Sequence, residues 1–150
     1  MKLAQALADR AATQQRIEQL RARLVANAKI QEGEKPSEDP HVLLAELDQA
    51  TAQLEDLIAR INLTNAQTIS NGQTLTQLLA RRDCLRLKVS VLRDFVTSAG
   101  ASVMRSMRSE IKILPSVAVA PLQKQVDGRS KELRELDGHI QELNWTTELL

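Results

Sequence analysis

Apolar residues recur along most of the chain at intervals of three and four, which is the spacing of one face of an α-helix. The first such stripe runs through residues 2–28 and consists of Leu3, Leu7, Ala11, Ile17, Leu20, Leu24 and Ala28. The charged segment that follows, residues 29–39, contains Gly33 and Pro36 and is typical of a loop. The pattern therefore predicts a helix over residues 2–28.

A second stripe predicts a helix over residues 40–67. Asp39 followed by Pro40 is a favourable helix start, because aspartate caps the free N–H groups and proline needs no partner in the first turn. The expected seam alternates strictly between steps of three and four, as in a coiled coil. It consists of Leu44, Leu47, Thr51, Leu54, Ile58, Ile61 and Asn65.

A third stripe predicts a helix over residues 74–99, separated from the second by the short polar turn Ser70–Gln73. Its seam consists of Leu75, Leu78, Arg82, Leu85, Val89, Leu92, Val96 and Ala99. A short turn between two apolar stripes is typical of an antiparallel αα-hairpin. We therefore expect the second and third helices to pair, with Arg82 opposite Ile58.

The helical pattern fails over residues 100–120, where alternation around Ile111, Ile113 and Val117 predicts a short strand or extended arm at about 108–120. A fourth helix is expected over residues 121–144. Its stripe consists of Leu122, Val126, Arg129, Leu133, Leu136, Ile140 and Leu143.

Together these elements predict a mainly all-α fold, a single domain over residues 1–150. Long antiparallel amphipathic helices would form coiled-coil-like hairpins or a helical bundle. The chain has only one Phe and one Trp, so aliphatic residues must build its core. Such a palette suits narrow helix-to-helix seams.

Polar residues within the seams are candidates for specifying assembly. Arg82 is the first, because a guanidinium at a seam position needs either solvent or a carboxylate, and Glu55 lies one turn from Ile58. Asn65 is the second, because a polar seam residue often fixes the register or the number of helices. The alternative is that such side chains reach solvent by snorkelling.

No pattern of residues indicates catalysis. The chain has two histidines and one cysteine, and it contains no phosphate-binding loop, dinucleotide motif or nucleophile elbow. We expect no enzymatic activity, no cofactor and no metal site. Cys84, next to the seam residue Leu85, is expected to be a small packed residue.

The formal net charge is +1, but residues 81–112 contain eight basic and three acidic side chains. This basic stretch raises the alternative of nucleic-acid binding, although aromatic residues that could stack on bases are scarce. No signal-peptide pattern and no long apolar run occur. We therefore expect a cytoplasmic protein that does not contact a membrane.

Several short phrases resemble a family of small bacterial helical proteins known as septicolysin-like. They are Arg16–Arg21, Gln31–Glu34, Ile61–Asn65, Leu79–Asp83, Arg108–Lys112, Leu122–Gln125 and Asn144–Leu149. The resemblance implies a membrane-active cytolysin as an alternative function. The leading hypothesis from the residues is a non-enzymatic homo-oligomer that acts through protein contacts, because its apolar stripes exceed what one slender hairpin can bury.

Overall fold

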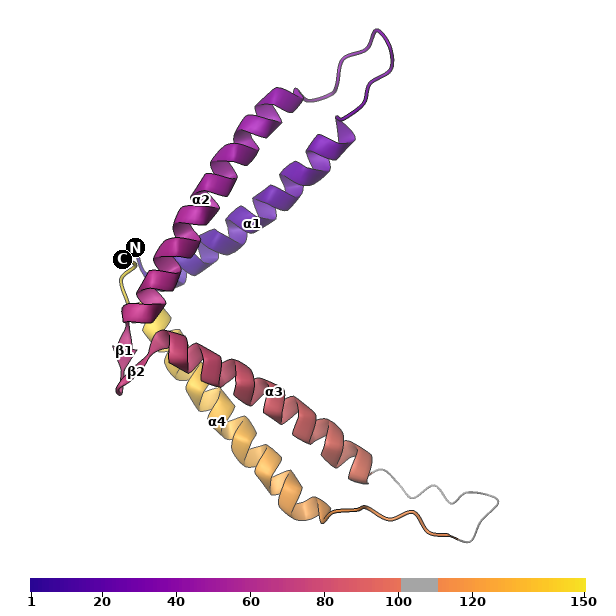
Figure 1. The fold of residues 1–150 in the computed structure, drawn as a ribbon, viewed down its shortest axis with the longest axis vertical. Coiled ribbons are helices and arrows are strands. Elements are labelled where there is room, and N and C mark those ends of the chain that lie inside the picture. The colour runs from indigo at the N-terminus through magenta and orange to yellow at the C-terminus, as the bar shows by residue number, and fades with distance from the viewer. Residues whose placement is uncertain (101–110) are drawn as a thin grey trace. The chain divides into compact units, whose positions relative to one another are not determined.

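The computed structural model describes residues 1–100 and 111–150, and over these residues the chain is mostly helical. Its elements are α1 (Leu3–Ala26), α2 (Pro40–Gln67), β1 (Ile69–Ser70), β2 (Gln73–Thr74), α3 (Leu75–Gly100) and α4 (Val119–Thr146) (Figure 1). The predicted all-α class is confirmed, and each expected helix is found with ends shifted by two residues or fewer.

The chain divides into two compact units, which we describe separately. The first unit comprises Met1–Leu75 and Glu142–Leu150, and the second comprises Thr76–Gln141. The expectation of one domain over residues 1–150 stays a prediction.

In the first unit α1 and α2 lie side by side (Figure 1). The start of α2 follows the predicted capping, because an oxygen of Asp39 accepts a hydrogen bond from the His41 N–H at 2.9 Å and Pro40 is the first helical residue. A side-chain hydrogen bond attaches the loop between the helices to α1, since Arg23 Nε donates to the Glu38 carboxylate at 3.0 Å. Residues 27–39 form the predicted loop.

The buried row between α1 and α2 has a heptad spacing that differs in phase from the predicted one. Buried residues of α1 are Leu3, Ala6, Thr13 and Leu20, and those of α2 are Leu43, Ala50, Leu57, Ile61 and Thr64. Leu44 and Ile58, expected in the seam, are exposed, and Thr51 is exposed as well. The prediction favoured large side chains, whereas close packing of two helices buries small residues such as Ala6 and Ala50.

A two-residue β-hairpin, not a helix-to-helix turn, follows α2. Strand β1 pairs with β2 through Ser70 and Gln73, and the two residues between them have positive φ angles, 51° at Asn71 and 80° at Gly72. Positive φ at both central positions defines a type I′ turn, for which Asn-Gly is the preferred sequence. The buried row of α2 packs against α1, and Ile58 is exposed, so the predicted αα-hairpin of the second and third helices, with Arg82 opposite Ile58, is wrong.

In the second unit α3 lies beside α4 (Figure 1). The row predicted for α3 is confirmed: Leu78, Leu85, Val89 and Val96 are buried and the remaining members are partly buried, apart from Leu75, which is buried within the first unit. On α4 the predicted Val126, Leu136 and Ile140 are buried, together with Ser130, which the pattern did not include. Polar side chains link the two helices, as between Arg93 and Ser130 at 3.1 Å.

The segment before α4 carries no regular structure where it is described. Residues 111–118 form no strand, and Ile111, Ile113 and Leu114 are exposed. Helix α4 begins at Val119, two residues before Pro121, which is tolerated because the first turn lacks internal N–H partners. The rest of the arm predicted around 108–120 lies outside the described residues.

Candidate functional site

A second apolar row runs along α3, separate from the row that packs against α4. It consists of Cys84, Leu87, Val91 and Phe95, which we call the outer stripe. Leu87 is 67% exposed, Val91 59% and Phe95 43%, and Cys84 is exposed as well. At about 100° per residue these four side chains fall within an arc of roughly 80°, on the side of α3 away from its buried row. Helix α3 therefore has two apolar faces, and only one is covered by described parts of the chain.

Charged side chains flank the outer stripe asymmetrically. The same helical geometry places Asp83 and Asp94 along one edge and Arg81 and Lys88 along the other. Lys88 is exposed and forms no ion pair with any residue that the structure describes. One edge of the stripe is thus acidic and the other basic.

The outward face of α2 provides a useful contrast. Leu44 and Ile58 are exposed there, but Asp48 and Glu55 lie between them on the same face. Glu55, a predicted assembly candidate, is exposed, and Asn65 is partly buried at the edge of this face. Acidic side chains interrupt the face, so α2 presents no continuous apolar row.

Arg82, the other predicted assembly candidate, lies in the inner row of α3. Its side chain is 20% exposed, and its guanidinium lies 3.0 Å from Asp83 and 3.6 Å from Asp137 of α4. Arg82 does contact carboxylates, as expected, but they belong to Asp83 and Asp137 and not to Glu55. The sequence interpretation chose Glu55 because it paired α3 with the wrong helix.

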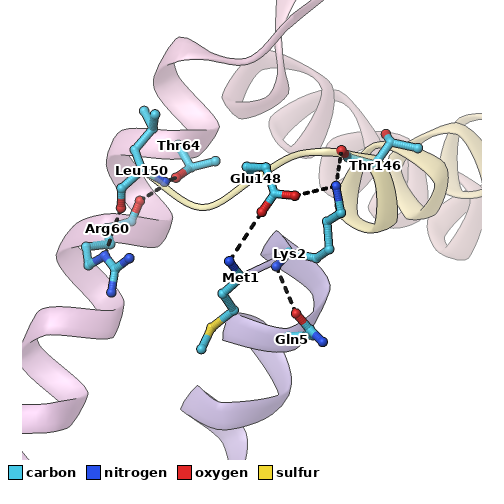
Figure 2. A network of polar contacts seen from close by, with 8 residues as sticks. All are labelled: Met1, Lys2, Gln5, Arg60, Thr64, Thr146, Glu148 and Leu150. Carbon is cyan, nitrogen blue, oxygen red and sulfur yellow. Dashed lines mark hydrogen bonds and ion pairs between the residues drawn. The ribbon is translucent and has the colours of Figure 1, made fainter.

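The two ends of the chain meet in the first unit. Lys2 and Glu148 form an isolated antiparallel β-bridge. Backbone hydrogen bonds flank it, from Leu3 N–H to Thr147 O at 2.9 Å and from Leu149 N–H to Met1 O at 2.8 Å. Further bonds tie Leu150 to α2: Arg60 Nε donates to Leu150 O at 2.8 Å, and Leu150 N–H donates to Thr64 Oγ1 at 3.1 Å (Figure 2). We call this group of contacts the terminal clasp.

Glu148 is the charged centre of the terminal clasp. Its carboxylate accepts from Lys2 Nζ at 2.6 Å and from the amino group of Met1 at 3.2 Å, as Figure 2 shows. These hydrogen bonds hold the pKa of Glu148 below the usual range of a glutamate. The carboxylate is therefore charged at neutral pH and serves to hold the two chain ends together.

Two other glutamates are held in the same way. Hydrogen bonds from Arg81 and Arg129 lower the pKa of Glu132, and a hydrogen bond from Arg23 lowers the pKa of Glu38. A carboxylate that is stabilised in its charged form is a poor proton donor at neutral pH. In the structure each of these carboxylates is the acceptor of an ion pair.

A polar groove of about 560 Å³ lies between α3 and α4. Its lining residues are Arg93, Val96, Thr97, Gln123, Val126, Asp127, Ser130 and Arg134. The sequence interpretation missed this groove because it searched each helix for one apolar face, whereas the groove forms where the polar edges of two helices meet.

Neither a metal-binding cluster nor a membrane-spanning helix is found among the described residues. Within residues 1–100 and 111–150, no group of three or more His, Cys, Asp or Glu side chains is placed to bind a metal ion. None of the described helices is long and apolar enough to cross a membrane. Cys84, expected to be packed, is exposed, because it belongs to the outer stripe and not to the inner row.

The basic stretch over residues 81–112 is partly neutralised by carboxylates. Arg81 contacts Glu132 at 2.7 Å, and Arg82 contacts Asp83 and Asp137. Residues 101–110 of this stretch lie outside the described residues. The described part therefore presents less free positive charge than its sequence suggests.

Two comparisons place the chain among known proteins. Residues 10–149 match a family of unknown function (DUF6847). A crystal structure of a functionally unknown conserved protein from Corynebacterium diphtheriae superposes with a TM-score of 0.92 at 42% sequence identity, covering 100% of this chain and 99% of the other. No curated protein matches.

These findings correct the family suggested by the short phrases. Neither comparison points to a septicolysin-like protein, so that resemblance is wrong. Phrases such as Arg16–Arg21 are runs of Arg, Glu, Gln and Leu that many amphipathic helices share, and they carry little information about ancestry. With a match that extends over residues 10–149, the chain belongs to the DUF6847 family of unknown function.

Proposed function

We propose that this protein acts through protein contacts and that it forms a homodimer along the outer stripe of α3. The observation that carries the proposal is the continuous exposed row Cys84, Leu87, Val91 and Phe95. Scattered exposed apolar residues need no explanation, but a row at helical spacing is the surface that a second helix covers. A dimer would remove this row from water.

The flanking charges favour a parallel arrangement of the two α3 helices. In a parallel pair related by a twofold axis along the helices, opposite edges of the two stripes face each other. The acidic edge with Asp83 would then meet the basic edge with Lys88 of the second copy. In an antiparallel pair identical edges would meet, so Asp83 would approach Asp94 of the second copy and the two Lys88 side chains would approach each other. Like charges facing each other oppose that arrangement.

The alternative of nucleic-acid binding has weaker support. Two arginines of the basic stretch already pair with carboxylates, and Phe95 is the single aromatic residue within the stretch. Single-stranded nucleic acid is usually bound by several stacking residues within a basic groove. The proposal assigns no catalytic role to any residue, and the cytoplasmic location stays a prediction.

Oxidative cross-linking tests both the dimer and its direction. A parallel pair places Cys84 opposite Cys84 of the second copy, within reach of a disulfide. We expect mild oxidation of the native protein at micromolar concentration to give a covalent dimer on a non-reducing gel. The control is the double variant Cys84→Ser, Arg86→Cys, whose thiol lies on the same helix but away from the outer stripe.

Two outcomes would contradict the proposal. The first is cross-linking of the native chain no faster than that of the control, which would indicate random collisions of exposed thiols. The second concerns a mixture of the native chain with a Cys84→Ser, Phe95→Cys variant. Preferential cross-linking between the two different chains would establish an antiparallel pair and refute the parallel one.

A further inference from the structure

The groove between α3 and α4 is lined by two arginines, one from each helix. Arg93 donates to the hydroxyl of Ser130 at 3.1 Å, and Arg134 lies one turn further along α4. Neither guanidinium forms an ion pair with any residue in the described ranges, whereas Arg81, Arg82 and Arg129 of the same unit each do. The groove is therefore lined by two guanidinium groups that no described carboxylate neutralises through an ion pair.

The chemistry of arginine indicates what this charge can bind. A guanidinium is always protonated, and its planar set of N–H groups matches the oxygens of a carboxylate or a phosphate. Two guanidiniums match a dianionic phosphate better than a carboxylate with a single charge. The volume of about 560 Å³ lies in the range of small-molecule sites.

Asp127 narrows the class of ligand further. It lines the groove on the other side of Ser130 from Arg134, and one of its oxygens accepts from Gln123 Nε2 at 3.0 Å. A ligand with only negative charge would be repelled by this carboxylate. A ligand that places an ammonium or hydroxyl group near Asp127 would donate a hydrogen bond to it.

We propose that this groove binds a small phosphate ester that carries a hydrogen-bond donor, with the phosphate between Arg93 and Arg134 and the donor at Asp127. The site does not depend on self-association, because its residues lie on the edge of α3 that faces α4 and not on the outer stripe. The ligand class is that of zwitterionic or hydroxylated monophosphates.

Calorimetric titration of the full chain with O-phosphoethanolamine and with inorganic phosphate tests the site. We expect saturable binding of both, with phosphoethanolamine the tighter of the two. Arg93→Gln and Arg134→Gln should each weaken phosphoethanolamine binding by about tenfold or more, because each removes a charged hydrogen-bond donor. Asp127→Asn should weaken the binding of phosphoethanolamine without weakening that of inorganic phosphate.

Arg86→Gln is the matched control, because it removes the same charge from α3 at a position outside the groove lining. It should change the affinity by less than about twofold, as expected for a screened surface charge. An equal loss in this control would show that the anion responds to overall charge and would overturn the proposal. Absence of saturable binding at millimolar ligand, with the helical circular dichroism spectrum of the chain intact, would overturn it as well.

Discussion

The α1–α2 and α3–α4 hairpins are built from helices of similar length, 24 and 28 residues in the first and 26 and 28 in the second, yet they present different surfaces. On α2, acidic residues break up the outward face, and the terminal clasp closes the first unit. On α3, the outward face is a continuous apolar row, and the two arginines of the groove between α3 and α4 form no ion pair with any described residue. Two hairpins built from similar helices therefore differ in what they leave exposed. The outward face of α2 has no continuous apolar row, whereas the outward face of α3 has one.

The largest expected effect is the loss of stability caused by a substitution in the buried row between α1 and α2. Leu20→Ala removes a fully buried side chain that packs with Leu43 and Ala50, and it should lower the free energy of unfolding by about 2–5 kcal/mol. Leu44→Ala, one residue from Leu43 but exposed, should change it by less than about 0.5 kcal/mol. Urea denaturation of both variants measures the difference. Equal losses in the free energy of unfolding would mean that Leu44 is buried in the seam of α2, as the sequence predicts.

The second prediction contrasts the outward faces of the two hairpins. Val91→Glu places a charge in the middle of the outer stripe and should weaken self-association by more than about tenfold. Leu63→Glu, on an exposed position of α2, should leave self-association unchanged. Sedimentation velocity over a range of concentrations measures both, with circular dichroism as a check of folding. Equal weakening by both variants would contradict self-association through the outer stripe of α3.

The third prediction concerns Arg82 in the inner row of α3. Arg82→Leu replaces an ion-paired side chain between buried Leu78 and Leu85, and it should raise the free energy of unfolding by up to about 2 kcal/mol. Because Arg82 contacts Asp137 of its own chain, the variant should keep the mass of the native protein. Thermal unfolding and light scattering measure the two quantities. A changed mass would support the assembly role that the sequence predicts for Arg82.

The smallest expected effect is in the terminal clasp. The pKa of Glu148 is lowered, so the carboxylate stabilises the folded chain above the ordinary glutamate pKa, and this contribution is lost as the pH falls through the lower folded value. Glu148→Gln should lower Tm at pH 7 by about one degree, and this difference should shrink below about pH 4.3. Glu135→Gln is the control, because Glu135 contacts Lys131 only at 3.9 Å on an exposed surface. A difference of the same size at low pH would show that the Glu148 side chain does not act through its charge, and no difference at pH 7 would show that the clasp acts through its backbone bonds alone.

Helix positions and caps were predictable from the sequence because they depend on local spacing and local chemistry. Asp39 and Pro40 marked the start of α2, and steps of three and four marked the inner row of α3. The partner of each helix was not predictable in the same way. A short polar turn between two apolar stripes predicts a helix-to-helix connection, whereas Asn71 and Gly72 form the loop of a two-residue β-hairpin, which Asn-Gly also favours. The predicted partner of α3 is therefore wrong.

The proposed binding surfaces are harder to predict from the sequence than the helices. The spacing of Cys84, Leu87, Val91 and Phe95 is visible in the sequence. The inner row of the same helix is longer and predicts α3 on its own, so the second row adds nothing to the prediction of that helix. The groove and the terminal clasp join residues far apart in sequence, such as Arg93 with Ser130 and Lys2 with Glu148. No local pattern encodes such contacts, because they exist only once the helices have packed.

The central claim is that the outer stripe of α3 is covered by a second copy of the chain. The mass in solution at micromolar concentration, measured by light scattering after size-exclusion chromatography, tests it most directly. A homodimer has twice the chain mass of 16.7 kDa, and this is the mass that we expect for the native protein. A single-chain mass that persists throughout the micromolar range would contradict it.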